Sequence, residues 1–421
     1  MRVTGYTLIA ALVAAGSAAS AAAVDKDAVV ANYADIAHAK YEDSLIAARA
    51  LSAAVSALTS SPSAETLFAA REAWLAARVP YQQTEVYRFG NPIVDDWEGR
   101  VNAWPLDEGL IDYVDASYGG ATDENPYAAL NVVANASFTL SGETIDASVI
   151  TPALLKSLHE ADEVEANVAT GYHAIEFLLW GQDLNGVRHG AGERPWTDYA
   201  AGDACTNGAC DRRAAYLEAA TELLVADLKE MTGAWATGGE ARVAVTSNAD
   251  AGVIAMLTGM GSLSYGEQAG ERMRLGLMLN DPEEEHDCFS DNTHNSHYYD
   301  GLGVRNVYHG RYVRIDGAVV EGPSLAALVA EADPVVGAGL SADIDATMIA
   351  LAAIKSAAES GFRYDQMLEA GNQAGEALIM GGVDALVAQT RGVERAVSAL
   401  AISPIAFEGS DSLDDPNAVF Q

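Results

Sequence analysis

Apolar residues along the chain recur mainly at the three-to-four-residue spacing of helices, and strand-like alternation is rare. Over residues 26–58 this spacing predicts one long amphipathic helix. A second helix is expected to begin at Ser61-Pro62, where a capping residue precedes a first-turn proline, and to kink at Pro80. The apolar stripe of the first helix consists of Tyr33, Ile36, Ala37, Tyr41, Leu45, Leu51, Val55 and Leu58.

The helical pattern decays over residues 89–150, where Gly, Pro, Asn and Asp become frequent. An irregular connection of this length favours a functional excursion over a passive linker. A third helix is then expected over residues 151–180, ending at Gly181, and a fourth over residues 211–235. These segments predict a helical bundle that carries one long insertion.

After Gly238-Gly239 the helical pattern begins again, and the polar residues 282–300 are expected to form a connection within it. Residues 311–320 form a candidate hairpin with Asp316-Gly317 at its turn. The pattern as a whole predicts an all-α fold of two helical-bundle halves, residues 24–238 and 239–421. Helices of the second half are expected over residues 242–280, 323–332, 342–372 and 374–402.

The first residues have the pattern of a secretory signal peptide, expected to be cut near Ala23. Arg2 precedes an apolar stretch at residues 8–13, which is too short for a permanent membrane anchor, and a run of small residues follows it. We therefore expect an exported protein that is not an integral membrane protein, located in the periplasm or envelope of a Gram-negative-type bacterium.

Composition narrows the classes of partner. The formal net charge of −36 excludes nucleic acid as a reasonable ligand, because a polyanion would be repelled. Much of this charge is expected simply to be a solvated surface. In an oxidising compartment Cys205 and Cys210 are expected to form a local disulfide around an Asn-Gly turn, which leaves Cys288 unpaired.

The string Gly-Tyr-His-Ala-Ile-Glu at residues 171–176 is the main candidate for chemistry. On a helix, His173 and Glu176 project from neighbouring positions, so that both side chains can reach one small cation. Two ligands are fewer than a transition-metal site usually needs. For an isolated His-x-x-Glu pair, an ion pair or a hydrogen bond at a helix contact is the commoner explanation.

Several rarer strings accompany this motif in a characteristic order, and together they resemble the imelysin-like family, in its iron-regulated protein A branch. The resemblance covers nearly all of the chain after residue 23. The strings are Arg71–Arg78, Gln83–Phe89, Val101–Glu108, Gly171–Asp183, Ala269–Met273 and Glu284–His294.

The resemblance implies an exported, all-helical protein whose GxHxxE motif contributes to a site near the junction of two bundle-like halves. The family was first classed with metallopeptidases, whereas many members resemble parts of iron-acquisition systems. His173 and Glu176 are the matched motif residues. Glu85 and Asp107 match acidic positions in the preceding strings and are carried over as further candidate ligands.

The residues favour metal binding over peptidase chemistry, because the chain has no HExxH motif and supplies carboxylates in abundance. Glu285, His286 and Asp287 are expected to lie in a loop that covers the site, although a solvated loop or a structural plug between the bundles would have the same composition. The expected ligand is a metal ion, foremost iron, or a small iron chelate, with envelope iron-transport components as partners. The alternatives are a zinc-dependent metallopeptidase with Glu176 as base or ligand, and a haem or iron-chelate carrier.

Overall fold

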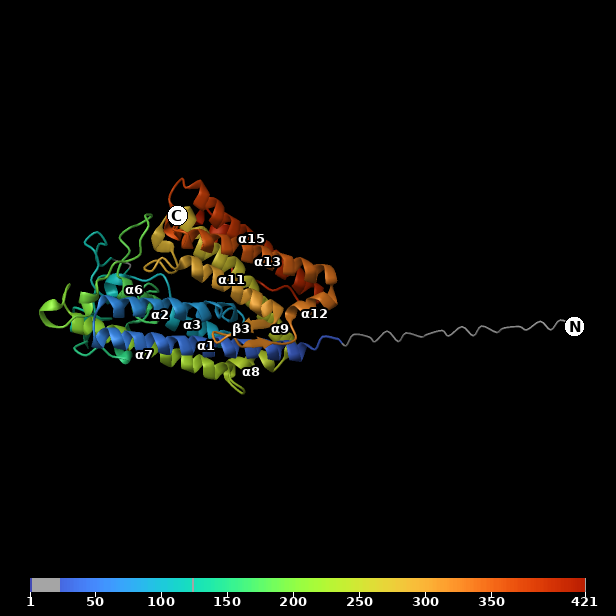
Figure 1. The fold of residues 1–421 in the computed structure, drawn as a ribbon, viewed down its shortest axis with the longest axis horizontal. Helices are drawn as coiled ribbons and strands as arrows, with labels where there is room; N and C mark the ends of the chain where they lie inside the picture. Colours follow the sequence, from blue (N-terminus) through green and yellow to red (C-terminus); the bar gives the residue numbers. More distant parts are fainter. Residues whose placement is uncertain (2–22, 123–124, 421) are drawn as a thin grey trace.

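The computed structural model of the protein describes residue 1, residues 23–122 and residues 125–420 (Figure 1). Within these residues the regular elements are helices, apart from two small antiparallel sheets of two strands each. The all-α fold class is therefore confirmed. The expected signal peptide falls almost wholly on residues 2–22, which lie outside the described residues.

The first bundle is built around α1 (Lys26–Ser60), which packs against α2 (Ala64–Gln82) and α7 (Cys210–Trp235). The apolar stripe predicted for α1 is buried along its whole length. The residue that caps α2 is Ser63 and not the expected Ser61, because Ser63 and Thr66 form a capping box. The helix continues through Pro80 and ends at Gln82.

The long excursion between α2 and α7 contains short elements. The prediction of a single helix over residues 151–180 is wrong: the chain leaves the helical conformation after α5 (Pro152–Leu158) and returns to a regular α-helix only at α6 (Gly171–Trp180). Between them Glu160, Asp162 and Glu163 have positive φ, which a right-handed helix does not accommodate. The elements are η1 (Glu85–Tyr87), α3 (Pro92–Asn102), α4 (Glu108–Ile111), β1 (Ser137–Leu140), β2 (Glu143–Asp146), α5 (Pro152–Leu158), η2 (Ala161–Glu163), α6 (Gly171–Trp180), η3 (Trp196–Tyr199) and η4 (Gly202–Ala204).

The second bundle is built mainly from α11 (Thr293–His309), α13 (Pro334–Glu359), α15 (Gln373–Ala399) and the π-helical segment η5 (Leu263–Leu275), which pack against one another. Among single helices in the described part of the chain, α13 alone has the length and the mean hydropathy, 1.5, that could cross a membrane. It packs here against α11, α12 (Leu325–Ala332) and α15. The elements are α8 (Glu240–Thr246), α9 (Ala249–Ser262), η5 (Leu263–Leu275), α10 (Gly276–Leu279), η6 (Pro282–Glu284), α11 (Thr293–His309), β3 (Arg311–Val313), β4 (Val319–Glu321), α12 (Leu325–Ala332), α13 (Pro334–Glu359), α14 (Tyr364–Leu368), α15 (Gln373–Ala399), α16 (Asp411–Asp414) and η7 (Ala418–Phe420).

Several boundaries in this half differ from expectation. The polar connection is shorter than residues 282–300, because α11 already begins at Thr293. The helix expected over 342–372 is divided into α13 and α14, with Gly361 at a φ of 103° between them. The helix expected over 242–280 breaks once, between α8 and α9, where Asn248 is extended and caps α9. From α9 it continues through η5 and α10 with helical backbone angles at both junctions. The hairpin is confirmed as β3 and β4, and so is the disulfide between Cys205 and Cys210.

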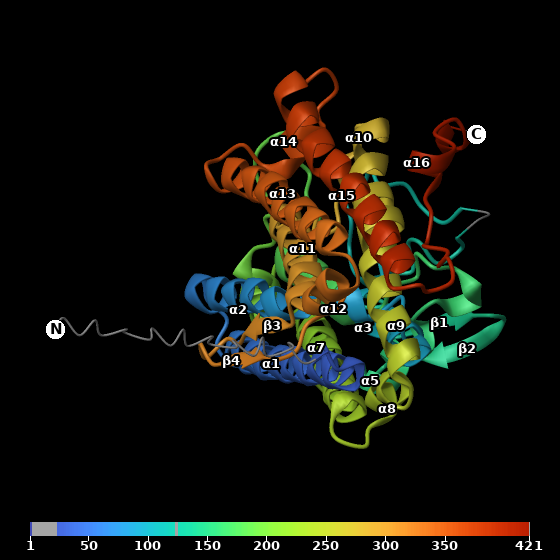
Figure 2. The ribbon, with the colours of Figure 1, turned by 90° about the vertical axis from the view of Figure 1, so that its right-hand side faces the viewer.

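The two bundles meet along α11. This helix contacts α2 and η1 of the first bundle on one side, and α12 and α13 on the other. Figure 2 shows the long helices of the second bundle standing across the layer of α1 and α2. α8 follows residue 239 in the sequence but packs against α1 and α7 of the first bundle. The domain boundary expected between residues 238 and 239 therefore stays a prediction. The junction places α6 and the segment before α11 face to face.

Candidate metal centre

The glycine of the GxHxxE motif fixes the start of α6. Gly171 has a φ of 83°, and a Cβ atom there would lie 2.5 Å from the carbonyl oxygen of Val101 at the end of α3. Only glycine fits both the positive φ and this close approach. Every residue of α6 is buried, so His173 and Glu176 project into the interior of the protein and not onto its surface.

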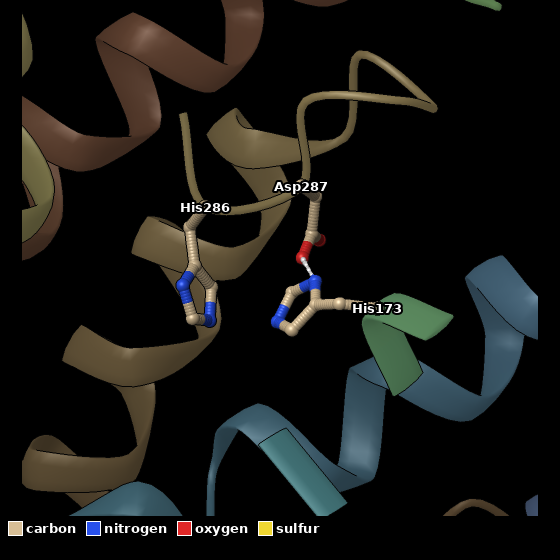
Figure 3. Close-up of side chains that lie close together, drawn as sticks. All are labelled: His173, His286 and Asp287. Carbon is tan, nitrogen blue, oxygen red and sulfur yellow. Dashed lines mark ion pairs between the residues drawn. The ribbon is translucent and has the colours of Figure 1, made fainter. Parts of the chain in front are cut away.

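His173 meets His286 and Asp287 there, and Figure 3 shows the three side chains converging from α6 and from the segment before α11. One potential ligand atom from each residue lies within 4.8 Å of the others. The Nδ1 atom of His173 is 3.9 Å from Oδ1 of Asp287, and the two imidazole rings are 4.8 Å apart between centroids. We call these three residues the His-His-Asp cluster.

Arg78 of α2 holds the carboxylate of this cluster in place. Its Nη2 atom donates to Oδ1 of Asp287 at 2.7 Å, and its Nη1 atom donates to Asn102 at 2.6 Å. Asn292 and Ser296 also donate to Oδ2 of Asp287. The charge of Arg78 helps to keep the pKa of the Asp287 carboxyl below its ordinary value despite complete burial.

Glu176 lies beside the cluster and is held from two sides. Its Oε2 atom is 3.1 Å from Nδ1 of His173. Its Oε1 atom accepts hydrogen bonds from the backbone nitrogen and the hydroxyl of Ser290, at 2.9 Å and 2.6 Å. Burial, with the nearby charge of Asp287, raises the pKa of Glu176 well above its ordinary value. The motif thus joins α6 to the segment before α11.

Several imidazole nitrogens of the cluster are available to bind a metal ion, because they make no hydrogen bond. Neither nitrogen of His286 has a hydrogen-bond partner, and neither does Nε2 of His173, although both residues are 1% exposed. Burial, reinforced by the charge of Arg78, lowers the pKa of His173 to about 3, and burial also lowers the pKa of His286. Buried polar atoms in proteins are normally satisfied. Unpaired imidazole nitrogens beside an anchored carboxylate have the chemistry that a divalent transition metal requires.

A cavity of about 280 Å³ leads from His286 toward the surface. Its wall contains Trp104, whose indole nitrogen donates to the carbonyl oxygen of Glu285 at 2.9 Å. The remaining charged residues of the wall are four glutamates and two arginines, so its formal charge is negative. They are Glu98, Glu160, Glu165, Glu267, Arg88 and Arg272.

The remaining two candidate ligands, Glu85 and Asp107, lie outside the cluster. Glu85 is buried in η1, where it accepts from Nη2 of Arg272 at 2.7 Å. Asp107 accepts from the hydroxyl of Tyr118 at 2.9 Å and lines a different cavity. Glu285 is 2% exposed. Neither Glu85 nor Asp107 belongs to the His-His-Asp cluster among the described residues.

The sequence placed His286 and Asp287 in a covering loop, whereas the structure brings both into contact with His173. It also adds two residues that sequence analysis did not assign to the site, Arg78 and Ser290. Arg78 ends the Arg71–Arg78 string, and Ser290 lies within the Glu284–His294 string. Their presence in those strings is the one signal that could have indicated them.

Comparison with known proteins agrees with this architecture. Residues 37–393 match the model of the imelysin peptidase family. A protein from Parabacteroides distasonis described as an iron-regulated protein A precursor has a similar solved structure, with a TM-score of 0.64, 19% identity, and coverage of 90% of this chain and 97% of that one. An imelysin-like protein from Psychrobacter arcticum has a TM-score of 0.57 and 16% identity, with coverage of 92% and 99%.

These two likenesses concern the fold, since both identities are low. No curated protein matches the chain significantly. The family match extends over most of the chain and includes α2, the whole of α6 and the segment before α11, which together build the site. The chain therefore belongs to the imelysin family.

Proposed function

We propose that this imelysin-family protein binds a divalent metal ion at the His-His-Asp cluster, with Glu176 either as a fourth ligand or as the hydrogen-bond partner that orients His173. The observation that carries the proposal is the convergence of two imidazoles and one carboxylate within 4.8 Å, together with the unpartnered imidazole nitrogens. A buried arrangement of this kind is costly unless something occupies it.

Two imidazoles and one carboxylate suit ferrous iron, and also zinc. This donor set is richer in nitrogen than the expected set of carboxylates with one imidazole, and therefore favours a borderline divalent cation over ferric iron. One of the proteins with a similar solved structure is described as an iron-regulated protein A precursor. We therefore assign iron as the physiological metal. The role we propose is iron acquisition or handling by an exported protein of the cell envelope.

The burial of the cluster argues for binding instead of peptide hydrolysis. His173, His286, Glu176 and Asp287 are each at most 1% exposed, whereas a metallopeptidase needs its metal, a water and a general base within reach of a polypeptide. A cavity of about 280 Å³ admits a hydrated ion. An extended peptide would need the bundles to separate.

The test is a titration of purified, metal-free protein with ferrous and zinc ions by calorimetry, under anaerobic conditions for iron. Wild type is expected to bind one ion tightly, and a His173→Ala, His286→Ala double variant is expected to lose at least about a hundredfold in affinity, because two of three ligands are removed. A matched control is His38→Ala, which changes a histidine of α1 outside the cluster. Equal affinities in all three proteins would overturn the assignment.

The peptidase alternative has its own test. Zinc-loaded wild type and the Glu176→Gln variant are incubated with an unfolded polypeptide, and fragments are followed by mass spectrometry. The proposal expects no cleavage by either protein. Cleavage by wild type that is absent from the variant would replace binding with metallopeptidase activity as the function of the site.

A further inference from the structure

A second group of potential ligands lies apart from the His-His-Asp cluster. It consists of Asp183, Asp291 and Asp365, and one carboxylate oxygen from each lies within 4.8 Å of the others. The three residues come from three separate segments: the loop after α6, the segment before α11, and the second residue of α14. The fold therefore gathers three carboxyl groups at one point from segments that are separate in the sequence.

Asp365 distinguishes this group from an ordinary cluster of acidic residues on the surface. The residue is 1% exposed, and neither of its carboxylate oxygens has a hydrogen-bond partner. A buried carboxylate without hydrogen bonds or a counter-charge is strongly disfavoured. No lysine or arginine in the described part of the chain forms an ion pair with any of the three aspartates. Among the charged neighbours, Glu285 adds to the repulsion, whereas Arg363 and His189 partly offset it by lowering the pKa of Asp291 without forming an ion pair.

The side chain of Asp183 is held in one orientation by hydrogen bonds. Its Oδ1 atom accepts from the backbone nitrogen and the side-chain nitrogen of Asn185, at 2.8 Å and 2.9 Å. Asp291 is 6% exposed. The hydrogen bonds of Asn185 thus orient Asp183, while no ion pair among the described residues neutralises the group and Arg363 and His189 offset its charge only in part.

We propose that Asp183, Asp291 and Asp365 bind a hard cation of the size of Ca²⁺. All the available donors are carboxylate oxygens, which suit hard cations and not the borderline metals that imidazoles prefer. With Ca–O bonds of about 2.3–2.6 Å, oxygens on opposite sides of the ion lie about 4.6–5.2 Å apart, so separations within 4.8 Å fit without rearrangement. Mg²⁺ would need shorter and more regular contacts.

The bound cation joins both halves of the protein. Asp183 belongs to the first bundle, and Asp365 lies on α14, which packs on α15 in the second. Asp291 shares its segment with His286 and Asp287. The cation therefore holds the segment that supplies two ligands of the His-His-Asp cluster, although it does not bind there.

The experiment compares wild type with Asp365→Asn by thermal unfolding, in chelator and in millimolar CaCl₂, with MgCl₂ at equal ionic strength as the reference. Wild type is expected to gain several degrees in Tm with Ca²⁺, and the variant is expected to gain none. In chelator the variant should be at least as stable as wild type, because one repelling charge is gone. Calorimetry should show one Ca²⁺ site per chain, weakened at least tenfold by the substitution.

Asp183→Asn is the second variant, should Asp365→Asn not fold, and it should lose the same response. Asp384→Asn, at an exposed position of α15, is the matched control and should respond as wild type does. An unchanged Ca²⁺ response in both cluster variants would overturn the proposal. So would a lower stability of Asp365→Asn in chelator, which would indicate a structural role. Measuring the ferrous or zinc affinity of Asp365→Asn separates a failure of the Ca²⁺ proposal from a failure of the proposed metal site at the His-His-Asp cluster. Only the His173→Ala, His286→Ala double variant tests that cluster.

Discussion

Arg78 is the cation that neutralises the buried carboxylate of the site, Asp287. Its guanidinium is 1% exposed, pairs with Asp287 at 2.7 Å, and lies 5.0 Å from the centroid of the Tyr172 ring and 5.5 Å from that of Trp74. The aromatic rings compensate part of its desolvation. Without this cation, the metal-free protein would hold an unneutralised carboxylate in its interior.

Replacing Arg78 by methionine should therefore lower the free energy of unfolding of the metal-free protein by about 3–5 kcal/mol, because one partner of a buried ion pair is left alone. Urea unfolding measures this change. The matched control is Arg395→Met, which breaks an ion pair with Asp343 at the surface and should cost less than about 1 kcal/mol. Similar costs for the two substitutions would contradict the importance given to Arg78.

Lys40 is a second buried cation, and its nitrogen donates to the carbonyl oxygen of Gln83 at 2.8 Å without a carboxylate partner. Burial lowers its pKa well below the ordinary value, whereas the unfolded chain keeps the proton up to about pH 10.4. Between these two values the unfolded state binds more protons, so the stability contributed by this residue rises with pH.

The difference in unfolding free energy between wild type and Lys40→Met should accordingly move in favour of wild type from pH 7 to pH 10, by at most about 1.4 kcal/mol per pH unit. Denaturant unfolding at several pH values measures it, and taking the difference cancels the other titrating groups. A difference that stays constant or falls with pH would show that Lys40 remains charged in the folded protein.

At the scale of elements, the sequence predicted the long helices well and their breaks poorly. α1, α7 and α15 follow their periodicity closely, because each buries a continuous apolar stripe. The break before α6 depends on contacts that are distant in sequence: Thr170 donates to the carbonyl oxygen of Arg100, and Gly171 lies against Val101. Periodicity within one segment carries no record of such contacts.

Gly171→Ala tests the account of α6. A Cβ at this position would meet the carbonyl of Val101 and would require a strained positive φ, so the substitution should destabilise the protein by about 1–3 kcal/mol. Gly233→Ala, in α7, is the control, since a Cβ there meets nothing within 4 Å and should stabilise by about 0.5–1 kcal/mol. Chemical unfolding compares the two, and equal effects would contradict the close-approach explanation.

The whole molecule explains why the candidate site could be predicted only in part. His173 and Glu176 were indicated by their spacing within one helix, which is local information. Their partnership with His286, Asp287 and Arg78 arises only when the two bundles meet along α11. The sequence therefore indicated the covering segment but not that two of its residues enter the cluster.

The central claim is that two imidazoles and a carboxylate at the junction of the bundles hold one metal ion. X-ray absorption at the metal edge of protein loaded with one equivalent of zinc, and then of ferrous iron, tests it most directly. The account predicts a coordination shell with two imidazole ligands in wild type, absent after His173→Ala and His286→Ala. A shell made only of oxygen atoms in the wild-type protein would place the metal elsewhere and contradict the account.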